Sequence, residues 1–110
     1  MKKKVLIVVS DYYKDISDAL LKSTKKYLNK KTNFEIIKVP GVFEIPIIIS
    51  KNVKKFDGFV AIGCVIKGKT AHFDLISKSV IDAIMYISID CKKPVGNCIL
   101  TCFNYKQALD

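Results

Sequence analysis

The sequence predicts an α/β fold in which helices cover a four-stranded parallel sheet. Four short apolar segments rich in valine and isoleucine recur along the 110-residue chain, and segments with helical periodicity separate them. Strands that alternate with helices of this length form right-handed βαβ units, which produce a parallel sheet. The chain is short enough that residues 1–110 are expected to form a single domain.

The first strand is predicted at Val5–Val9, an unbroken aliphatic run of the kind that is buried on both faces of a sheet. An amphipathic helix should follow from Ile16 to about Lys30, with Asp15 or Ser17 available as its cap. The residues at helical spacing on its apolar face are Ile16, Ala19, Leu20, Tyr27 and Leu28.

The second strand is predicted at Phe34–Val39, and a proline-glycine pair typical of a tight turn ends it. The segment Val42–Lys55 is ambiguous. Ile47–Ile49 favours a strand, whereas Glu44 and Pro46 suit the first turn of a helix. The alternation of strands and helices decides for a helix.

The third strand is predicted at Gly58–Val65, and Lys67–Thr70 forms a polar turn after it. A long helix should follow from Ala71 to Asp90. Its apolar face would hold Leu75, Ile76, Val80, Ala83, Ile84 and Ile87. The fourth strand is predicted at Pro94–Thr101, and Asn104–Asp110 resembles the first turn of another helix.

The charge pattern limits the classes of partner. The formal net charge is +9, and all 19 basic residues are lysine. Sequence-specific DNA recognition favours the planar arginine fork, so this chain is a poor candidate for it. No apolar run reaches the roughly 18 residues of a membrane-spanning helix. The N-terminal apolar run lacks a signal-peptide cleavage site, so we expect a cytoplasmic protein that binds neither nucleic acid nor membrane.

The cysteines are expected to be reduced core thiols. They lie in or beside apolar segments and form no C-x-x-C pair, which disfavours a metal site or a disulfide. The four are Cys64, Cys91, Cys98 and Cys102.

A ligand site is expected at one edge of the sheet, because ligands of parallel sheets bind beyond the carboxyl ends of the strands. The segments predicted to meet there are Ser10–Tyr13, Pro40–Glu44, Val65–His72 and the edge of the fourth strand.

Four features of these segments suggest chemistry, and each has a simpler structural explanation. His72 is predicted at the start of a helix, where the ring stays neutral and can take a proton. The simpler explanation is that His72 caps the helix or packs locally. Gly68–Thr70 suits a phosphate but is a weak signal alone. Glu44 is either a buried acceptor for substrate hydroxyls or a favourable charge in a first helical turn. Tyr12-Tyr13 can stack on a planar ring or pack as ordinary side chains.

Three blocks of sequence resemble the lumazine synthase family of riboflavin biosynthesis. Val39–Pro46 and Ile62–Asp74 resemble its two signature segments. Pro94–Thr101, followed by Gln107-Ala108, resembles its next strand and helix start in order and spacing. The resemblance covers the chain from about residue 4 to the end.

This resemblance implies a flavodoxin-like three-layer α/β/α fold with strand order 2-1-3-4. It implies condensation of 5-amino-6-(D-ribitylamino)uracil with 3,4-dihydroxy-2-butanone 4-phosphate to 6,7-dimethyl-8-ribityllumazine, with release of phosphate. No metal or redox cofactor is implied. A homo-oligomer, a pentamer or a larger shell, is implied, with active sites between neighbouring subunits, and a complex with riboflavin synthase is left open.

The resemblance also implies roles for individual residues. Tyr12 would stack on the pyrimidine, and Val42, Phe43 and Glu44 would bind the uracil and the ribityl chain. His72 would transfer protons, and Asn97 would stand where a neighbouring subunit commonly contributes an aromatic ring. Cys64, Val65 and Ile66 would line the pyrimidine pocket, and Lys69 and Thr70 would hold the phosphate.

The chain departs from the family pattern near its end. Family members continue with a phosphate-binding arginine and two helices, whereas this sequence stops at Asp110, so we expect a fold without those helices. We therefore expect one face of the sheet to be partly uncovered, and Lys69 to supply part of the lost charge. Tyr13 stands where asparagine is common. A noncatalytic relic or fragment with a structural role is the main alternative to a working synthase, and a basic nucleotide-binding module is a weaker one.

Overall fold

The computed structural model describes the backbone of residues 3–28, 32–66 and 72–102, and the side chains in these ranges apart from 72–74 and 100–102. Four strands form one parallel sheet in the order β2-β1-β3-β4. They are β1 (Lys3–Ser10), β2 (Thr32–Val39), β3 (Gly58–Ile66) and β4 (Val95–Cys102).

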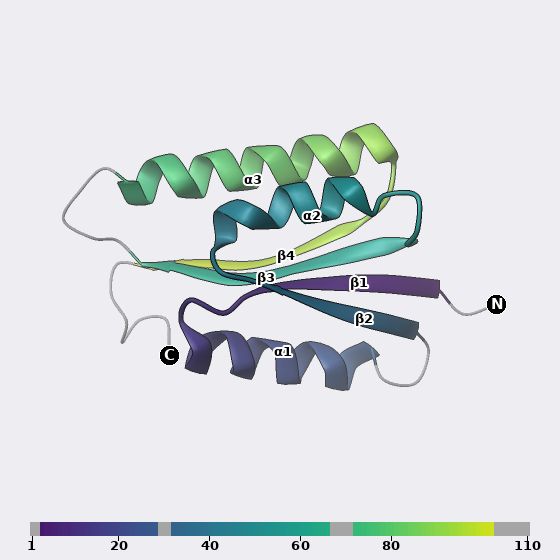
Figure 1. The fold of residues 1–110 in the computed structure, drawn as a ribbon, viewed down its shortest axis with the longest axis horizontal. Helices are drawn as coiled ribbons and strands as arrows, with labels where there is room; N and C mark the ends of the chain where they lie inside the picture. Colours follow the sequence, from purple (N-terminus) through teal and green to yellow (C-terminus); the bar gives the residue numbers. More distant parts are fainter. Residues whose placement is uncertain (1–2, 29–31, 67–71, 103–110) are drawn as a thin grey trace.

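Helices lie on both faces of this sheet, as Figure 1 shows. Helix α1 (Lys14–Leu28) lies on one face, and α2 (Ile45–Lys51) and α3 (His72–Cys91) lie on the other. A short 3-10 turn, η1 (Val42–Glu44), leads into α2. The three-layer, flavodoxin-like arrangement and the strand order are therefore confirmed. None of the helices in the described ranges is long and apolar enough to cross a membrane.

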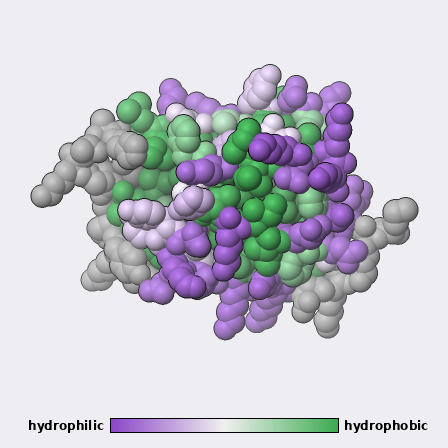
Figure 2. All heavy atoms as spheres, in the orientation of Figure 1, coloured by the Kyte–Doolittle hydropathy of each residue, from purple (hydrophilic) through white to green (hydrophobic). Residues whose placement is uncertain are grey.

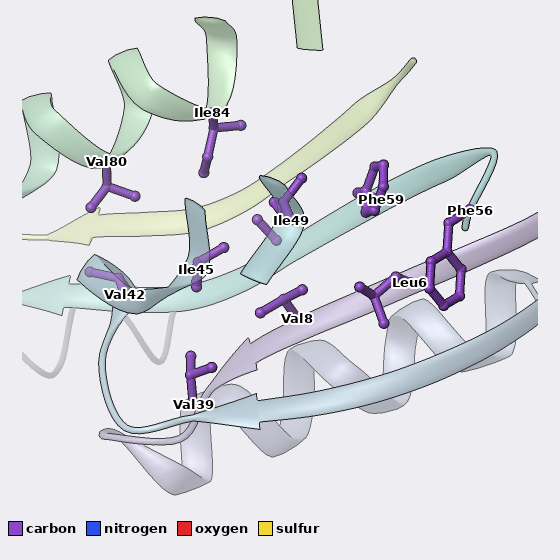
Figure 3. Close-up of a cluster of buried hydrophobic side chains, with 11 residues drawn as sticks. Leu6, Val8, Val39, Val42, Ile45, Ile49, Phe56, Phe59, Val80 and Ile84 are labelled. Atoms are coloured by element: carbon purple, nitrogen blue, oxygen red, sulfur yellow. The ribbon is translucent and has the colours of Figure 1, made fainter. Parts of the chain in front are cut away.

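The two central strands are covered on both faces, which explains why their sequences are apolar without alternation. Leu6 and Val8 of β1 point to the layer of α2 and α3, whereas Ile7 and Val9 point to α1. All four are essentially inaccessible to solvent. Burial of each such aliphatic side chain contributes about 1.5–3 kcal/mol, so the continuous run is needed on both faces. Figure 3 shows the larger cluster, on the α2 and α3 side.

The ambiguous segment after β2 is helical, as predicted, but the helix is shorter than expected. It ends at Lys51, where Asn52 Nδ2 donates to the Ile48 carbonyl at 2.7 Å and the Asn52 amide donates to Ile49. The amide of Lys55 then donates to the Asn52 carbonyl at 3.0 Å, forming a turn before β3. A run of isoleucines forms a helix here because Ile45 and Ile49, four residues apart, share one buried face.

Two predictions about the helix faces were wrong. On α1, Tyr27 is 93% exposed and Ala19 is exposed, while Leu21 is buried. On α3, Leu75 is 67% exposed, although Ile76, Val80, Ile84 and Ile87 pack against the core. Leu75 lies about 100° around the helix from Ile76, and the stripe that contacts the sheet is too narrow to include both.

The predicted helix start at Asn104–Asp110 lies outside the described residues. Among the described cysteines, Cys64 is buried, Cys91 and Cys98 are partly buried, and none of these three forms a disulfide. On the α1 side of β3 and β4, Val60 and Cys98 are only partly buried and Gly96 is exposed. Of the described helices, α1 alone lies on that side.

Candidate active site

The loops after β1, β2 and β3 begin at the same edge of the sheet, because the strands that precede them are parallel. The amide of Asp11, just after β1, donates to the carbonyl of Val39 at the end of β2, at 3.2 Å. The amide of Glu44 donates to the Gly41 carbonyl, also at 3.2 Å, and closes the turn after β2. The predicted meeting of these segments is confirmed for their described parts.

At Gly63 of β3, the turn after β2 and the end of β1 approach the strand closely. A Cβ atom on Gly63 would lie 2.5 Å from Val42 Cγ1 and 3.3 Å from Ser10 Cβ. The side chain of Val42, from the turn after β2, therefore occupies the space above Gly63 beside the end of β1. Any larger residue at this position would separate the three segments. A glycine inside an apolar strand is the sequence signal of such a close approach.

Ser17 of α1 fixes the loop after β1 from inside. It is fully buried, its Oγ donates to the Ser10 carbonyl, and its amide donates to the Tyr13 carbonyl at 3.0 Å. The predicted role of Ser17 as a helix cap is wrong, because α1 already begins at Lys14 and the hydroxyl is a donor to the preceding strand. The chain between Ser10 and Tyr13 is thus held at both ends by one residue.

Tyr12 and Tyr13 in this loop form an edge-to-face aromatic pair, with ring centroids 4.9 Å apart and an interplanar angle of 76°. Tyr12 is 74% exposed, whereas Tyr13 is partly buried. Burial raises the pKa of the Tyr13 phenol, and the nearby Tyr12 and Cys64 raise it further. Tyr13 therefore carries a neutral hydroxyl.

The turn after β2 presents its residues to different surroundings. Val42 belongs to the core, and Phe43 is 62% exposed and lines a groove between α2 and α3. Glu44 is exposed, and its carboxylate folds back toward Gly41, where a Cβ atom would lie 3.1 Å from Oε2. The expected burial of Glu44 is therefore wrong, whereas its role as an acceptor for substrate hydroxyls stays a prediction. Its place at the start of α2 fits the other reading, a favourable charge in a first helical turn.

The three residues expected to line the pyrimidine pocket alternate between the faces of the sheet. Cys64 is buried and lies two residues beyond Ile62, which packs on the α1 side. Val65 is partly buried against the core on the α2 and α3 side. Ile66 is partly buried at the end of the strand. Because successive side chains of a strand point to opposite faces, Cys64 and Val65 cannot point into the same side of the site.

Asn97 does not lie with the other candidates in this chain. It is exposed on β4, an edge strand, where it pairs with Ala61, and its Oδ1 accepts a hydrogen bond from the Ile99 amide at 3.0 Å. The residue of β4 that pairs with Cys64 is three positions further on, about 10 Å along the strand.

Three further candidates lie partly or wholly outside the description. Lys69 and Thr70 fall outside the described residues, and so does the side chain of His72. His72 is the first residue of α3, so it begins the helix as the sequence indicated. Within the described ranges, no group of three or more histidine, cysteine, aspartate or glutamate side chains could hold a metal ion.

Comparison with known proteins places the chain in a family. The family model for 6,7-dimethyl-8-ribityllumazine synthase matches residues 2–110. The enzyme of that name from Bartonella tribocorum is 42% identical, over 98% of this chain and 76% of its own length. Those from Bartonella henselae and Corynebacterium kroppenstedtii are 44% and 38% identical, over 97% of this chain and 72% and 68% of their own lengths. With a family match over nearly its whole length and the three-layer fold, the chain belongs to the 6,7-dimethyl-8-ribityllumazine synthase family.

Proposed function

We propose that this protein is a transferase that condenses 5-amino-6-(D-ribitylamino)uracil with 3,4-dihydroxy-2-butanone 4-phosphate. The products are 6,7-dimethyl-8-ribityllumazine, phosphate and water, and the step belongs to riboflavin biosynthesis. The observation that carries the proposal is the family match over residues 2–110, at 38–44% identity to relatives of that name. The same match disfavours an unrelated nucleotide-binding module.

The site in this proposal is the edge of the sheet where the segments after β1, β2 and β3 begin. Tyr12 would stack on the pyrimidine, and its 74% exposure leaves the ring accessible from solvent. The turn Val42–Glu44 would contact the uracil and the ribityl chain. Because Phe43 lines the groove between α2 and α3, this contact would come from the backbone of the turn and from the exposed Glu44.

The chemistry requires an amine of the pyrimidine to attack a ketone, followed by loss of phosphate and closure of a ring. Much of the acceleration would come from holding the two substrates together, because converting a bimolecular step into a unimolecular one removes a large entropic barrier. His72 would move protons between the reacting groups. Lys69 and Thr70 would hold the phosphate as it leaves, with Lys69 acting as a point charge.

The test is product formation by the purified protein. We expect 6,7-dimethyl-8-ribityllumazine to form from the two substrates faster than in a protein-free mixture at the same concentrations. A folded chain that yields product only at the spontaneous rate would support the alternative of a noncatalytic relic, and the proposal would then fail.

We also propose that the protein works in the cytoplasm as a homo-oligomer, a pentamer or a larger shell. The α2 and α3 layer leaves apolar surface open, and Figure 2 shows hydrophobic side chains at the surface over these helices. An open groove of about 330 Å³ lies between α2 and α3, and its lining includes Ile47, which is 54% exposed. Met85, Tyr86 and Ile89 are exposed further along α3. A patch of this kind on a soluble enzyme typically marks an interface.

Sedimentation velocity at micromolar concentration checks the assembly, and we expect a mass several times the 12.4 kDa of one chain. Replacing Ile47, at the groove, by glutamate should shift the mass downward, because it places a charge in a contact that excludes water. Replacing Tyr27 by glutamate is the matched control, since Tyr27 lies on α1, on the other side of the sheet. A single species at the monomer mass would contradict the assembly.

A further inference from the structure

The loop after β1 holds two tyrosines of unequal surroundings, and only the first of them has a role in the proposed function. Tyr12 is 74% exposed, whereas Tyr13 is partly buried. The two rings meet edge to face at 4.9 Å and 76°, within the distance range that aromatic pairs prefer. Tyr13 is thus the less accessible ring of the pair.

The backbone of Tyr13 is fixed as well as its ring. Its carbonyl accepts the Ser17 amide at 3.0 Å, and the buried Ser17 hydroxyl donates to Ser10 at the other end of the loop. The Asp11 amide donates to Val39 at 3.2 Å and ties the same loop to β2. These bonds leave the loop little freedom to move relative to the sheet.

An exposed tyrosine that must stack on a ligand ring loses side-chain entropy when it binds, unless a neighbour already limits its orientations. The edge-to-face contact supplies such a limit. An edge-to-face contact covers at most one face of a ring, whichever tyrosine presents its edge. Tyr13 therefore leaves at least one face of the Tyr12 ring uncovered. The contact therefore limits the orientation of the Tyr12 ring and leaves Tyr12 74% exposed.

We propose that Tyr13 is a positioning residue that orients the ring of Tyr12 for stacking on the pyrimidine. Tyr13 acts through Tyr12 and not through its own contact with the substrate. The inference rests on the proposed function, because it takes the pyrimidine to be the ring that stacks on Tyr12. The hydroxyl of Tyr13 is secondary here, and the ring is the part that acts.

The test measures the dissociation constant of 6,7-dimethyl-8-ribityllumazine from its own fluorescence anisotropy, so it does not depend on turnover. Tyr13→Leu should weaken binding by about 2- to 10-fold, the factor that corresponds to ordering one side chain on binding. Tyr13→Phe keeps the ring and should bind within about 2-fold of the parent. Tyr13→Met, which also lacks the ring, replaces Tyr13→Leu if the leucine variant does not fold, with the same expected result.

A double-mutant cycle separates positioning from direct contact. If Tyr13 acts through Tyr12, the variant carrying both Tyr12→Leu and Tyr13→Leu should bind no more weakly than Tyr12→Leu alone. Tyr27→Leu is the matched control for loss of an exposed tyrosine, and it should leave binding unchanged, because Tyr27 lies near the opposite end of α1. Additive losses in the cycle would overturn the inference, as would full affinity in Tyr13→Leu.

Turnover by the parent protein distinguishes this inference from the proposed function. Where product forms, the Michaelis constant for the pyrimidine should rise in Tyr13→Leu while that for the phosphate substrate and kcat stay near the parent values. A general loss of structure would change all three and would overturn the positioning role. A parent that binds the lumazine in this Tyr13-dependent way but forms no product would refute the proposed function alone. A parent that does not bind it would overturn the inference.

Discussion

Replacing Gly63 by alanine should destabilise the protein by about 1–3 kcal/mol, the usual cost of forcing an extra carbon into a close-packed site. The added Cβ would lie 2.5 Å from Val42 Cγ1 and 3.3 Å from Ser10 Cβ, and both neighbours belong to segments that other contacts hold in place. Val42 is buried in the core, and Ser10 is anchored by the hydroxyl of Ser17. The free energy of unfolding, measured with urea, checks this expectation.

The matched control is Gly96→Ala. Gly96 lies in the adjacent strand β4, and a Cβ there would meet nothing closer than 3.8 Å, an ordinary contact with Phe59 and Val60. We expect a change within about 0.5 kcal/mol, typical of a surface substitution without a clash. A cost equal to that of Gly63→Ala would show that loss of glycine in a strand, and not the close approach of Val42, explains the result.

A second variant identifies the atom responsible. Val42→Ala removes the Cγ1 atom that the new methyl group would meet, although it costs stability by opening a small cavity. The two substitutions together should therefore cost at least about 1 kcal/mol less than the sum of the single costs. Additivity within about 0.5 kcal/mol would mean that the strain lies elsewhere. Because Val42 belongs to the turn proposed to bind substrate, Gly63→Ala should also raise the Michaelis constants.

The strands of the sheet could be predicted from the sequence because a strand that is buried on both faces is apolar at every position. The run Val5–Val9 is apolar at every position, and the structure packs it between two layers. The buried faces of the helices were harder to predict. Their exposed faces carry apolar residues such as Leu75 and Tyr27, which periodicity alone cannot separate from the stripe that contacts the sheet.

The site was predictable at the level of loops and much less so at the level of side chains. Parallel strands bring their carboxyl ends to one edge whatever the sequence of the loops, so the meeting of these segments followed from the fold class. Whether Glu44 is buried, or which of Tyr12 and Tyr13 is the more exposed, depends on local turns and contacts that no pattern encodes. The hydroxyl of Ser17 shows the same limit, because a cap and a donor to the preceding strand use the same residue type.

Replacing His72 by alanine should lower kcat by about 100-fold, at the low end of what general acid–base catalysis contributes. The low end applies because the reaction also needs its two substrates held together, and that part of the acceleration does not require an imidazole. His72 is the only histidine of the chain and the first residue of α3, so the substitution removes the one imidazole that could carry a proton. Initial rates of lumazine formation at saturating substrates give the value.

Lys78→Ala is the control, because Lys78 is exposed on the same helix and should leave kcat unchanged. Added imidazole should restore part of the rate of His72→Ala and leave the rate of Lys78→Ala unchanged, since only the former variant lacks a proton carrier. The residual rate of His72→Ala measures the part of the acceleration that does not depend on the imidazole. If His72→Ala still exceeds the spontaneous reaction, positioning by the segments at the sheet edge accounts for the remainder. A fall to the spontaneous rate with unchanged substrate binding would instead show that proton transfer is the main source of the acceleration, and the assignment of catalysis largely to proximity would be wrong.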